Sequence, residues 1–174
     1  LKASGCSAPS ILVVPASLIG NWKNEIAKFA PSLDFKILHP SEDKDSGGTE
    51  IRLMSARPFL AITSYGMLSR TPWLCKIEWA VVILDEAQAI KNPGARQTKA
   101  VKQLRGSHRI ALTGTPVENR LGDLWSIFDF INPGLLGGAK QFGEYAKSLS
   151  SAEGADFGPL RSLVRPYILR RLKT

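Results

Sequence analysis

The stretch Ala80-Val81-Val82-Ile83-Leu84-Asp85-Glu86-Ala87-Gln88 decides the fold of this 174-residue chain. Its first five residues are apolar and three of them are β-branched, which is typical of a strand buried on both faces of a parallel sheet. Two acids follow directly, so they are expected at the carboxyl edge of the sheet, where open α/β sheets bind ligands. Such a pair can hold Mg²⁺ and orient a water against a phosphate. The pair alone equally allows a strand that simply stops at two acids.

Strand and helix patterns alternate along the rest of the chain. Apolar runs predict further strands at 11–15, 34–38, 60–65 and 109–113. Apolar residues at helical spacing predict helices at 19–29, 97–105, 121–131, 142–149 and 160–168. Gly106 is expected to end the second of these helices, and Trp22, Phe29 and Trp125 are expected to pack inward. The alternation predicts an α/β fold, with a mainly parallel sheet flanked by helices.

Composition narrows the class of protein. The net charge of +8, from 23 basic and 15 acidic residues, favours polyanionic partners. Cys6 and Cys75 are too few for a disulfide framework, which indicates a reducing, intracellular setting. His39 and His108 lack partners at ligand spacing, so no zinc-type metal is expected. No apolar run approaches the roughly 20 residues that span a bilayer, and no secretory leader is present, so no membrane association is expected.

Three of the expected strands end in polar, small or acidic residues. These ends are Ser64-Tyr65, Asp85-Glu86 and Thr113-Gly114-Thr115. In a parallel sheet they meet at one edge, and small hydroxyl residues there can bond a carboxylate or a phosphate. Together they predict a phosphate-handling face, which one such ending would not.

Four ordered motifs carry a family resemblance. They are Leu12-Val-Val-Pro-Ala-Ser17, Asp85-Glu-Ala-Gln-Ala-Ile-Lys-Asn-Pro93, Ala111-Leu-Thr-Gly-Thr-Pro-Val-Glu-Asn119 and Tyr167-Ile-Leu-Arg-Arg-Leu-Lys173. The chain closely resembles the first RecA-like lobe of the Swi/Snf-type, superfamily two helicase-like ATPases. The resemblance implies one partial helicase-type ATP-binding domain of the P-loop NTPase class over residues 1–174. Such proteins are ATP-driven translocases on double-stranded DNA that remodel protein–DNA complexes.

The resemblance also implies roles for individual residues. Asp85 would bind Mg²⁺ through water, and Glu86 would polarise the attacking water. Gln88 makes this a DEAQ box where many relatives have His, and it could hydrogen-bond across to the strand end Thr113, Gly114 and Thr115. Contacts to DNA phosphates would come from two segments, Pro15, Ala16, Ser17 and Leu18, and Thr63, Ser64 and Tyr65. For Ser17 and Thr63, local capping is the alternative.

One expected part is missing from the chain. The phosphate loop G-x-x-x-x-G-K-[ST] should precede the strand at 11–15, yet Gly-Lys occurs nowhere. The chain, which begins at Leu1, is therefore expected to be a fragment that lacks the first strand and the loop. ATP and Mg²⁺ are expected in the parent protein, and neither is expected bound to the fragment. The alternative is a non-enzymatic interaction module derived from such a lobe, which a gene without a Gly-Lys-Thr loop upstream would favour.

Partners and location follow from the same resemblance. The expected partners are the backbone of double-stranded DNA, the second RecA-like lobe and, across the truncated sheet, another copy of the chain. Residues 158–174 carry five basic residues and no acid, which fits either a phosphate-binding stripe or a solvated link toward that absent lobe. The expected location is intracellular, at the nucleoid of a bacterium or in the nucleus of a eukaryote.

Overall fold

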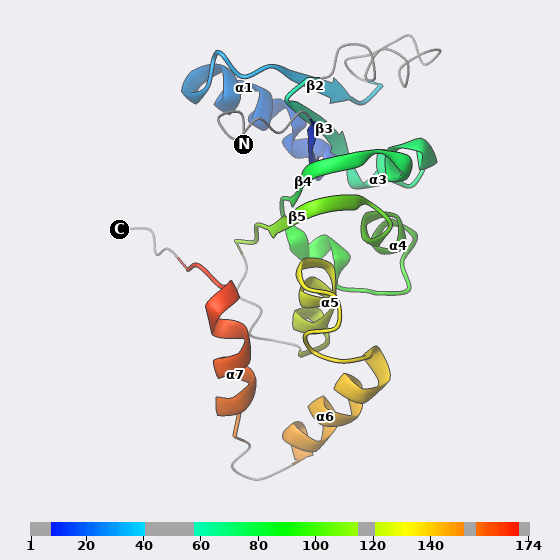
Figure 1. The fold of residues 1–174 in the computed structure, drawn as a ribbon, viewed down its shortest axis with the longest axis vertical. Coiled ribbons are helices and arrows are strands. Elements are labelled where there is room, and N and C mark those ends of the chain that lie inside the picture. Colours follow the sequence, from blue (N-terminus) through cyan, green and yellow to red (C-terminus); the bar gives the residue numbers. More distant parts are fainter. Residues whose placement is uncertain (1–7, 41–57, 115–120, 152–155, 171–174) are drawn as a thin grey trace. The chain divides into compact units, whose positions relative to one another are not determined.

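The computed structural model describes residues 8–40, 58–114, 121–151 and 156–170, and Figure 1 shows their helices and strands. Five strands, all paired in parallel, form one sheet in the order β2-β3-β1-β4-β5. Their bounds are β1 Ser10–Val14, β2 Phe35–Leu38, β3 Leu60–Ser64, β4 Glu78–Leu84 and β5 Arg105–Ala111. The expected α/β fold with a parallel sheet is confirmed.

Helical segments connect the strands. Helix α1 (Ile19–Phe29) follows a 3₁₀ turn at Ala16–Leu18 and leads from β1 to β2. Helix α3 (Tyr65–Leu68) and a 3₁₀ segment at Pro72–Lys76 lie between β3 and β4. A 3₁₀ segment at Ala87–Ile90 and helix α4 (Arg96–Lys102) lie between β4 and β5. Helix α5 (Leu121–Ile131) comes after β5.

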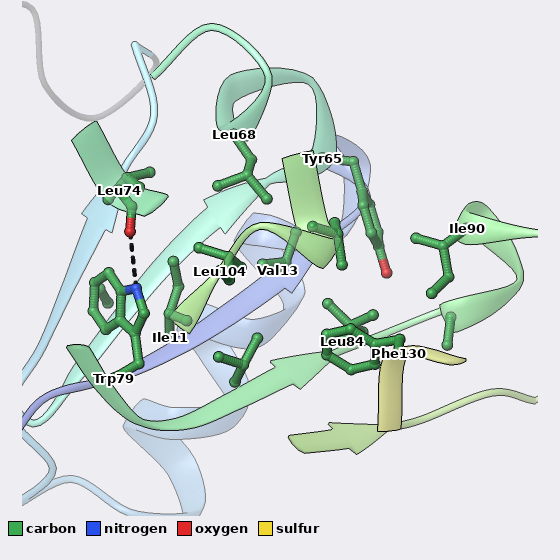
Figure 2. Packing of buried hydrophobic residues seen from close by; sticks show 14 of the residues in the cluster. Ile11, Val13, Tyr65, Leu68, Leu74, Trp79, Leu84, Ile90, Leu104 and Phe130 are labelled. Carbon is green, nitrogen blue, oxygen red and sulfur yellow. Dashed lines mark hydrogen bonds between the residues drawn. The ribbon is translucent and has the colours of Figure 1, made fainter. Parts of the chain in front are cut away.

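Residues of strands β1 to β4 pack into two apolar layers on opposite faces of the sheet, because successive strand side chains point to opposite faces. One layer joins Ile11, Val13, Val82 and Leu84 to side chains from α3, α4 and α5. Figure 2 shows this layer, in which the Trp79 indole donates a hydrogen bond of 3.0 Å to the Leu74 carbonyl. The other layer joins the opposite strand residues to α1, through Leu12, Val14, Ile62, Ile19 and Ile26. The central strands β1 and β3 are therefore buried on both faces.

The chain divides into two compact units, Leu1–Leu136 and Gly137–Thr174. In the second unit, helix α6 (Ala139–Ser151) buries Phe142, whose ring lies 6.1 Å from that of Tyr145. Helix α7 (Gly158–Val164) buries Leu160 and Val164 and is followed by a 3₁₀ turn at Arg165–Tyr167. The single-domain description of residues 1–174 stays a prediction.

The start of the last strand differs from the expectation. Helix α4 ends at Lys102, and β5 already begins at Arg105, so Gly106 lies inside a strand and does not end a helix. The reason is tertiary: a Cβ at Gly106 would lie 2.6 Å from Cγ2 of the buried Val82, so glycine lets β5 approach β4 closely. Gly106 therefore marks a close approach between two strands and not the end of a helix.

Two aromatic residues also differ from the expectation. Phe29, expected on the inner face of its helix, is 70% exposed: it is the last residue of α1, and Lys28 Nζ lies 4.8 Å from the centre of its ring. Trp125, expected in the core, is half-buried, and Lys102 Nζ lies 4.7 Å from its ring while pairing with Asp129 at 2.6 Å. The sequence also predicts an exposed, acidic loop at 39–50 and a helical turn at 51–56; most of this loop and the whole turn lie outside the described residues.

Candidate functional site

Polar ends of three parallel strands come together at the carboxyl edge of the sheet. The backbone N–H of Asp85 donates to the Val13 carbonyl at 2.9 Å, which continues the ladder one residue past β4. The Tyr65 hydroxyl donates to the Asp85 carbonyl at 2.7 Å, and Ala87 N–H donates to the Leu112 carbonyl at 2.8 Å. These bonds join the residues after β3, β4 and β5 into one surface, as the strand-end pattern predicted.

The Asp85 carboxylate is held at both oxygens. Its Oδ1 accepts the Glu86 backbone N–H at 2.9 Å, and its Oδ2 accepts the Trp22 indole N–H at 2.7 Å. A carboxylate offers about four acceptor positions, so room remains for a metal-bound water at either oxygen. This donor set fits Mg²⁺, which prefers carboxylate and water ligands. Asp85 would hold the ion through such a water.

Trp22 is the residue of this site that the sequence pattern missed. It packs against the apolar layer under α1, as its helical spacing predicted, but it is only half-buried and its N–H reaches Asp85. A signal for this existed in the sequence. Trp22 lies one turn into the helix that follows β1, so its side chain begins near the carboxyl edge of the sheet.

Glu86 adopts a backbone conformation that is unusual for its type. Its φ of 50° and ψ of 52° lie in the left-handed region, where a non-glycine residue costs about 1–3 kcal/mol. Among the described residues other than glycine it alone has a positive φ. The turn directs the chain from β4 into the 3₁₀ segment at Ala87–Ile90. Strain of this kind is common where a side chain must be presented to a ligand.

Gln88 connects the second acid to the neighbouring strand end. Its Nε2 donates to Glu86 Oε2 at 2.5 Å, and its Oε1 accepts from Thr113 Oγ1 at 2.9 Å. The hydrogen bond expected across to Thr113 is therefore present, and it leaves glutamine in one orientation because each end of the amide has a partner. Gly114 is exposed, and Thr115 lies outside the described residues.

The two segments assigned to DNA differ in accessibility. Ala16 and Ser17 are exposed on the turn that follows β1, with Pro15 and Leu18 half-buried. The side chains of the other segment are used inside the lobe: Thr63 Oγ1 donates to the Leu38 carbonyl at 3.1 Å, and Ser64 Oγ accepts from Met67 N–H as a helix cap. A direct contact to phosphate would thus fall first to 15–18, and the role of both segments stays a prediction.

Tyr65 is buried, with 5% of its surface exposed. Burial disfavours its phenolate and raises the pKa of the hydroxyl well above 10, and the charges of Asp85 and Glu86 raise it further. The phenol therefore stays a hydrogen-bond donor, so its hydroxyl positions the backbone of the first acid. This use of Tyr65 was not expected from the sequence.

The basic segment lies in the second unit. Arg161, Arg165 and Arg170 are exposed, and residues 171–174 lie outside the described part of the chain. Within the described residues, no group of three or more His, Cys, Asp or Glu gathers as a metal site. None of the described helices is long and apolar enough to cross a membrane.

Comparison with known proteins identifies the family of this chain. The SNF2-related domain family matches residues 2–174, nearly the entire chain. The chain belongs to this family. A solved structure of the SWI2/SNF2 ATPase core from Sulfolobus solfataricus in complex with double-stranded DNA is 39% identical, with a TM-score of 0.85. The match covers 98% of this chain and 35% of that one.

Curated relatives of this SNF2-related domain come from bacteria and eukaryotes. A putative ATP-dependent helicase/translocase of Bacillus subtilis, YwqA, is 39% identical over 99% of this chain and 19% of its own length. The TATA-binding protein-associated factor mot1 of Schizosaccharomyces pombe is 37% identical over 95% of this chain and 9% of its own length. The chain thus spans a fifth or less of these relatives, and its fold is that of the RecA-like lobe of the SNF2 ATPase core.

Proposed function

We propose that this chain is the acid-bearing lobe of an ATP-dependent translocase on double-stranded DNA, which couples ATP hydrolysis to movement along the duplex. The observation that carries the proposal is the hydrogen-bonded series from Asp85 through Glu86 and Gln88 to Thr113. Family membership and the DNA-bound SWI2/SNF2 core support it. The protein would work inside the cell, where it meets DNA.

The residues divide the chemistry between them. Bound Mg²⁺ would neutralise charge that develops on the transferred phosphoryl group. Asp85 would hold the ion's water shell, with both its oxygens already oriented by N–H donors. Glu86 would orient the attacking water, and Gln88 keeps one of its carboxylate oxygens in place. Because Gln88 also contacts Thr113, a displacement of either strand end would reach the acids.

Hydrolysis of ATP, with and without duplex DNA, tests this function. We expect no hydrolysis by the 174 residues alone, because the Gly-Lys phosphate loop is absent from them and an arginine finger from a second lobe, worth roughly 10³ to 10⁵ in rate, is absent too. In a protein that also supplies both parts, DNA should stimulate hydrolysis. Glu86→Gln should lower its rate by about 10² or more. The matched control Glu25→Gln, on the exposed face of α1, should leave the rate unchanged.

Three results would contradict the proposal. DNA-stimulated hydrolysis by the purified 174-residue chain would show that the lobe does not need the missing parts. If the Glu86→Gln variant of the longer protein hydrolyses ATP at the wild-type rate, Glu86 takes no part in the reaction. A longer protein that folds and binds DNA but hydrolyses no ATP would favour the interaction module.

We also propose that the outer edge of β5 takes a further strand. This strand pairs with β4 on one side and is the last in the described sheet. Ile110 and Leu112 beside this edge are 46% and 40% exposed. Unpaired strand edges readily accept another strand, from the longer protein or from a second copy. Light scattering that shows a strict monomer of the chain at high concentration would exclude the second copy.

A further inference from the structure

Trp22 and Asp85 are joined by a hydrogen bond between two elements that are 63 residues apart in sequence. The indole Nε1 lies 2.7 Å from Asp85 Oδ2, short for a bond from N–H to oxygen, as expected for a charged acceptor. An indole N–H can only donate, so it selects an oxygen acceptor. The bond fixes the carboxylate from the side of α1.

The position of Trp22 in α1 connects this bond to the turn at Ala16–Leu18. Helix α1 continues directly from the exposed turn Ala16–Leu18, and Leu18 N–H closes that turn on the Pro15 carbonyl at 2.9 Å. Trp22 follows Leu18 by four residues, about 6 Å along the helix axis. The turn and the indole therefore belong to one continuous helical segment, whose indole contacts the carboxylate of Asp85.

A second indole in the same lobe shows what a purely structural use looks like. Trp79 is 1% exposed, and its N–H donates to the Leu74 carbonyl five residues away. That bond satisfies a buried donor within one local segment. Trp22 is half-buried and its helix faces solvent on one side, so water could have satisfied its N–H. Its partner is instead the carboxylate of Asp85.

We propose that Trp22 is a positioning residue, which holds the Asp85 carboxylate toward the metal and transmits DNA contact at residues 15–18 to it. The inference rests on the proposed function, because it assigns regulation to the same site. When the turn engages phosphate, α1 is fixed and so is the carboxylate. Without DNA, the turn and the acid are free to move together, which lowers the population of the geometry that hydrolyses ATP.

The test removes the donor and keeps an aromatic ring. In the longer protein, Trp22→Phe should raise the Mg²⁺ concentration for half-maximal hydrolysis about 10-fold or more, as loss of outer-shell metal partners does. DNA stimulation should fall by a similar factor. At saturating Mg²⁺, the KM for ATP should change less than about twofold, because the bond that is lost goes to the Asp85 carboxylate. Excess Mg²⁺ should restore part of the rate, which it would not do for a protein that has merely unfolded.

Trp79→Phe is the matched control. It makes the same chemical change, an indole donor lost from a packed site of the same lobe. We expect it to lower the melting temperature and to leave the Mg²⁺ requirement and the DNA stimulation unchanged. If Trp22→Phe does not fold, β-(3-benzothienyl)alanine at position 22 keeps the shape of the indole and removes only the N–H.

A second measurement, by NMR, detects the hydrogen bond between Trp22 and Asp85 without measuring hydrolysis. In the 174-residue chain with ¹⁵N-labelled tryptophan, the indole signal of Trp22 is identified as the one that Trp22→Phe removes. Asp85→Asn replaces a charged acceptor by a neutral one and should move that signal upfield, while the signal of Trp79 stays in place. A Trp22 signal that does not respond to Asp85→Asn would overturn the bond itself.

The two proposals fail in different ways. A longer protein without DNA-stimulated hydrolysis, or one that tolerates Glu86→Gln, would defeat the proposed function. If stimulation is present and Glu86→Gln abolishes it, yet Trp22→Phe keeps the wild-type Mg²⁺ dependence and stimulation, only the role of Trp22 is wrong.

Discussion

At the residue scale, the two acids are held by different means. Asp85 is oriented by hydrogen bonds from Trp22, Glu86 and Tyr65, which reach its carboxylate and its carbonyl. Glu86 is oriented by a left-handed backbone and by Gln88. The first arrangement stabilises the lobe, whereas the second costs conformational energy that the surrounding packing must offset. Stability measurements can separate the two.

Because Glu86 has a left-handed conformation, we expect glycine at this position to give a more stable protein than alanine, the reverse of the usual order in a helix. Both Glu86→Gly and Glu86→Ala remove the carboxylate, but glycine tolerates a φ of 50°. We expect the glycine variant to unfold with a free energy about 1 kcal/mol higher than the alanine variant, measured by urea denaturation. At Glu25, exposed in α1, the order should reverse by about 0.5–1 kcal/mol. The same order at both positions would argue against the left-handed turn.

Tyr65→Phe should lower the free energy of unfolding by about 1 kcal/mol at pH 7, because the Asp85 carbonyl loses its hydroxyl partner. The folded pKa of Tyr65 is raised, so its hydroxyl stabilises the fold fully below its ordinary pKa of 10.0 and loses this effect as pH rises above that value. The wild-type advantage over Tyr65→Phe should therefore shrink between pH 10 and 11, by at most about 1.4 kcal/mol.

Urea denaturation of both proteins at several pH values checks this prediction. Other titrating groups cancel in the difference between the two proteins. The control Tyr145→Phe, on the exposed side of α6, should change stability by less than about 0.5 kcal/mol at pH 7. A gap that widens above pH 10 would contradict the raised pKa of Tyr65.

At the element scale, the edge of the sheet is determined by close packing between β4 and β5. Gly106 faces the buried Val82, and the two strands pair from Glu78↔Arg105 to Leu84↔Ala111. Periodicity predicted the existence of β5 but placed its start four residues late, since Arg105, Ser107 and His108 do not read as a buried strand. These residues are exposed, which an edge strand allows.

Gly106→Ala should destabilise the first unit by about 1–3 kcal/mol, because the added methyl would overlap Val82 at 2.6 Å. Gly20→Ala is the matched control. Apart from its chain neighbours and the backbone of α1 itself, nothing lies within 4 Å of a Cβ at this position, so alanine should be neutral or stabilise by up to about 1 kcal/mol. Thermal denaturation of both variants gives the comparison. Equal melting temperatures would show that β5 does not approach β4 as closely as described.

At the scale of the whole molecule, the basic net charge and the exposed turn at the carboxyl edge predict binding to the phosphates of DNA. The net charge is +8, and the turn at 15–18 presents Ala16 and Ser17 to solvent. Contacts of this kind bind phosphate without reading sequence. Affinity for duplex DNA should therefore be weak, with a Kd no better than roughly 10⁻⁴ to 10⁻⁶ M, and should fall with salt.

DNA binding by the chain should show a log–log salt slope near about −2.7, the value for about three phosphate contacts. Ser17→Asp should weaken binding by about fivefold, since a like charge near phosphate costs about 1 kcal/mol in water. Ser32→Asp adds the same charge to the exposed loop after α1, at the other edge of the sheet, and should weaken binding less. Fluorescence anisotropy at several salt concentrations measures the affinity of the unchanged chain and of both variants. Sequence-selective binding would contradict phosphate contact.

The sequence by itself determined the parallel sheet, the placement of Asp85 and Glu86 at its carboxyl edge, and the family. These follow from local features, because buried apolar runs and strand-end residues lie within a few positions of one another. Tertiary structure alone decided that Tyr65 turns inward to the Asp85 carbonyl and that Trp22 reaches its carboxylate, across 20 and 63 residues. The direction of such side chains depends on partners distant in sequence, and helical spacing records only that Trp22 has an apolar side.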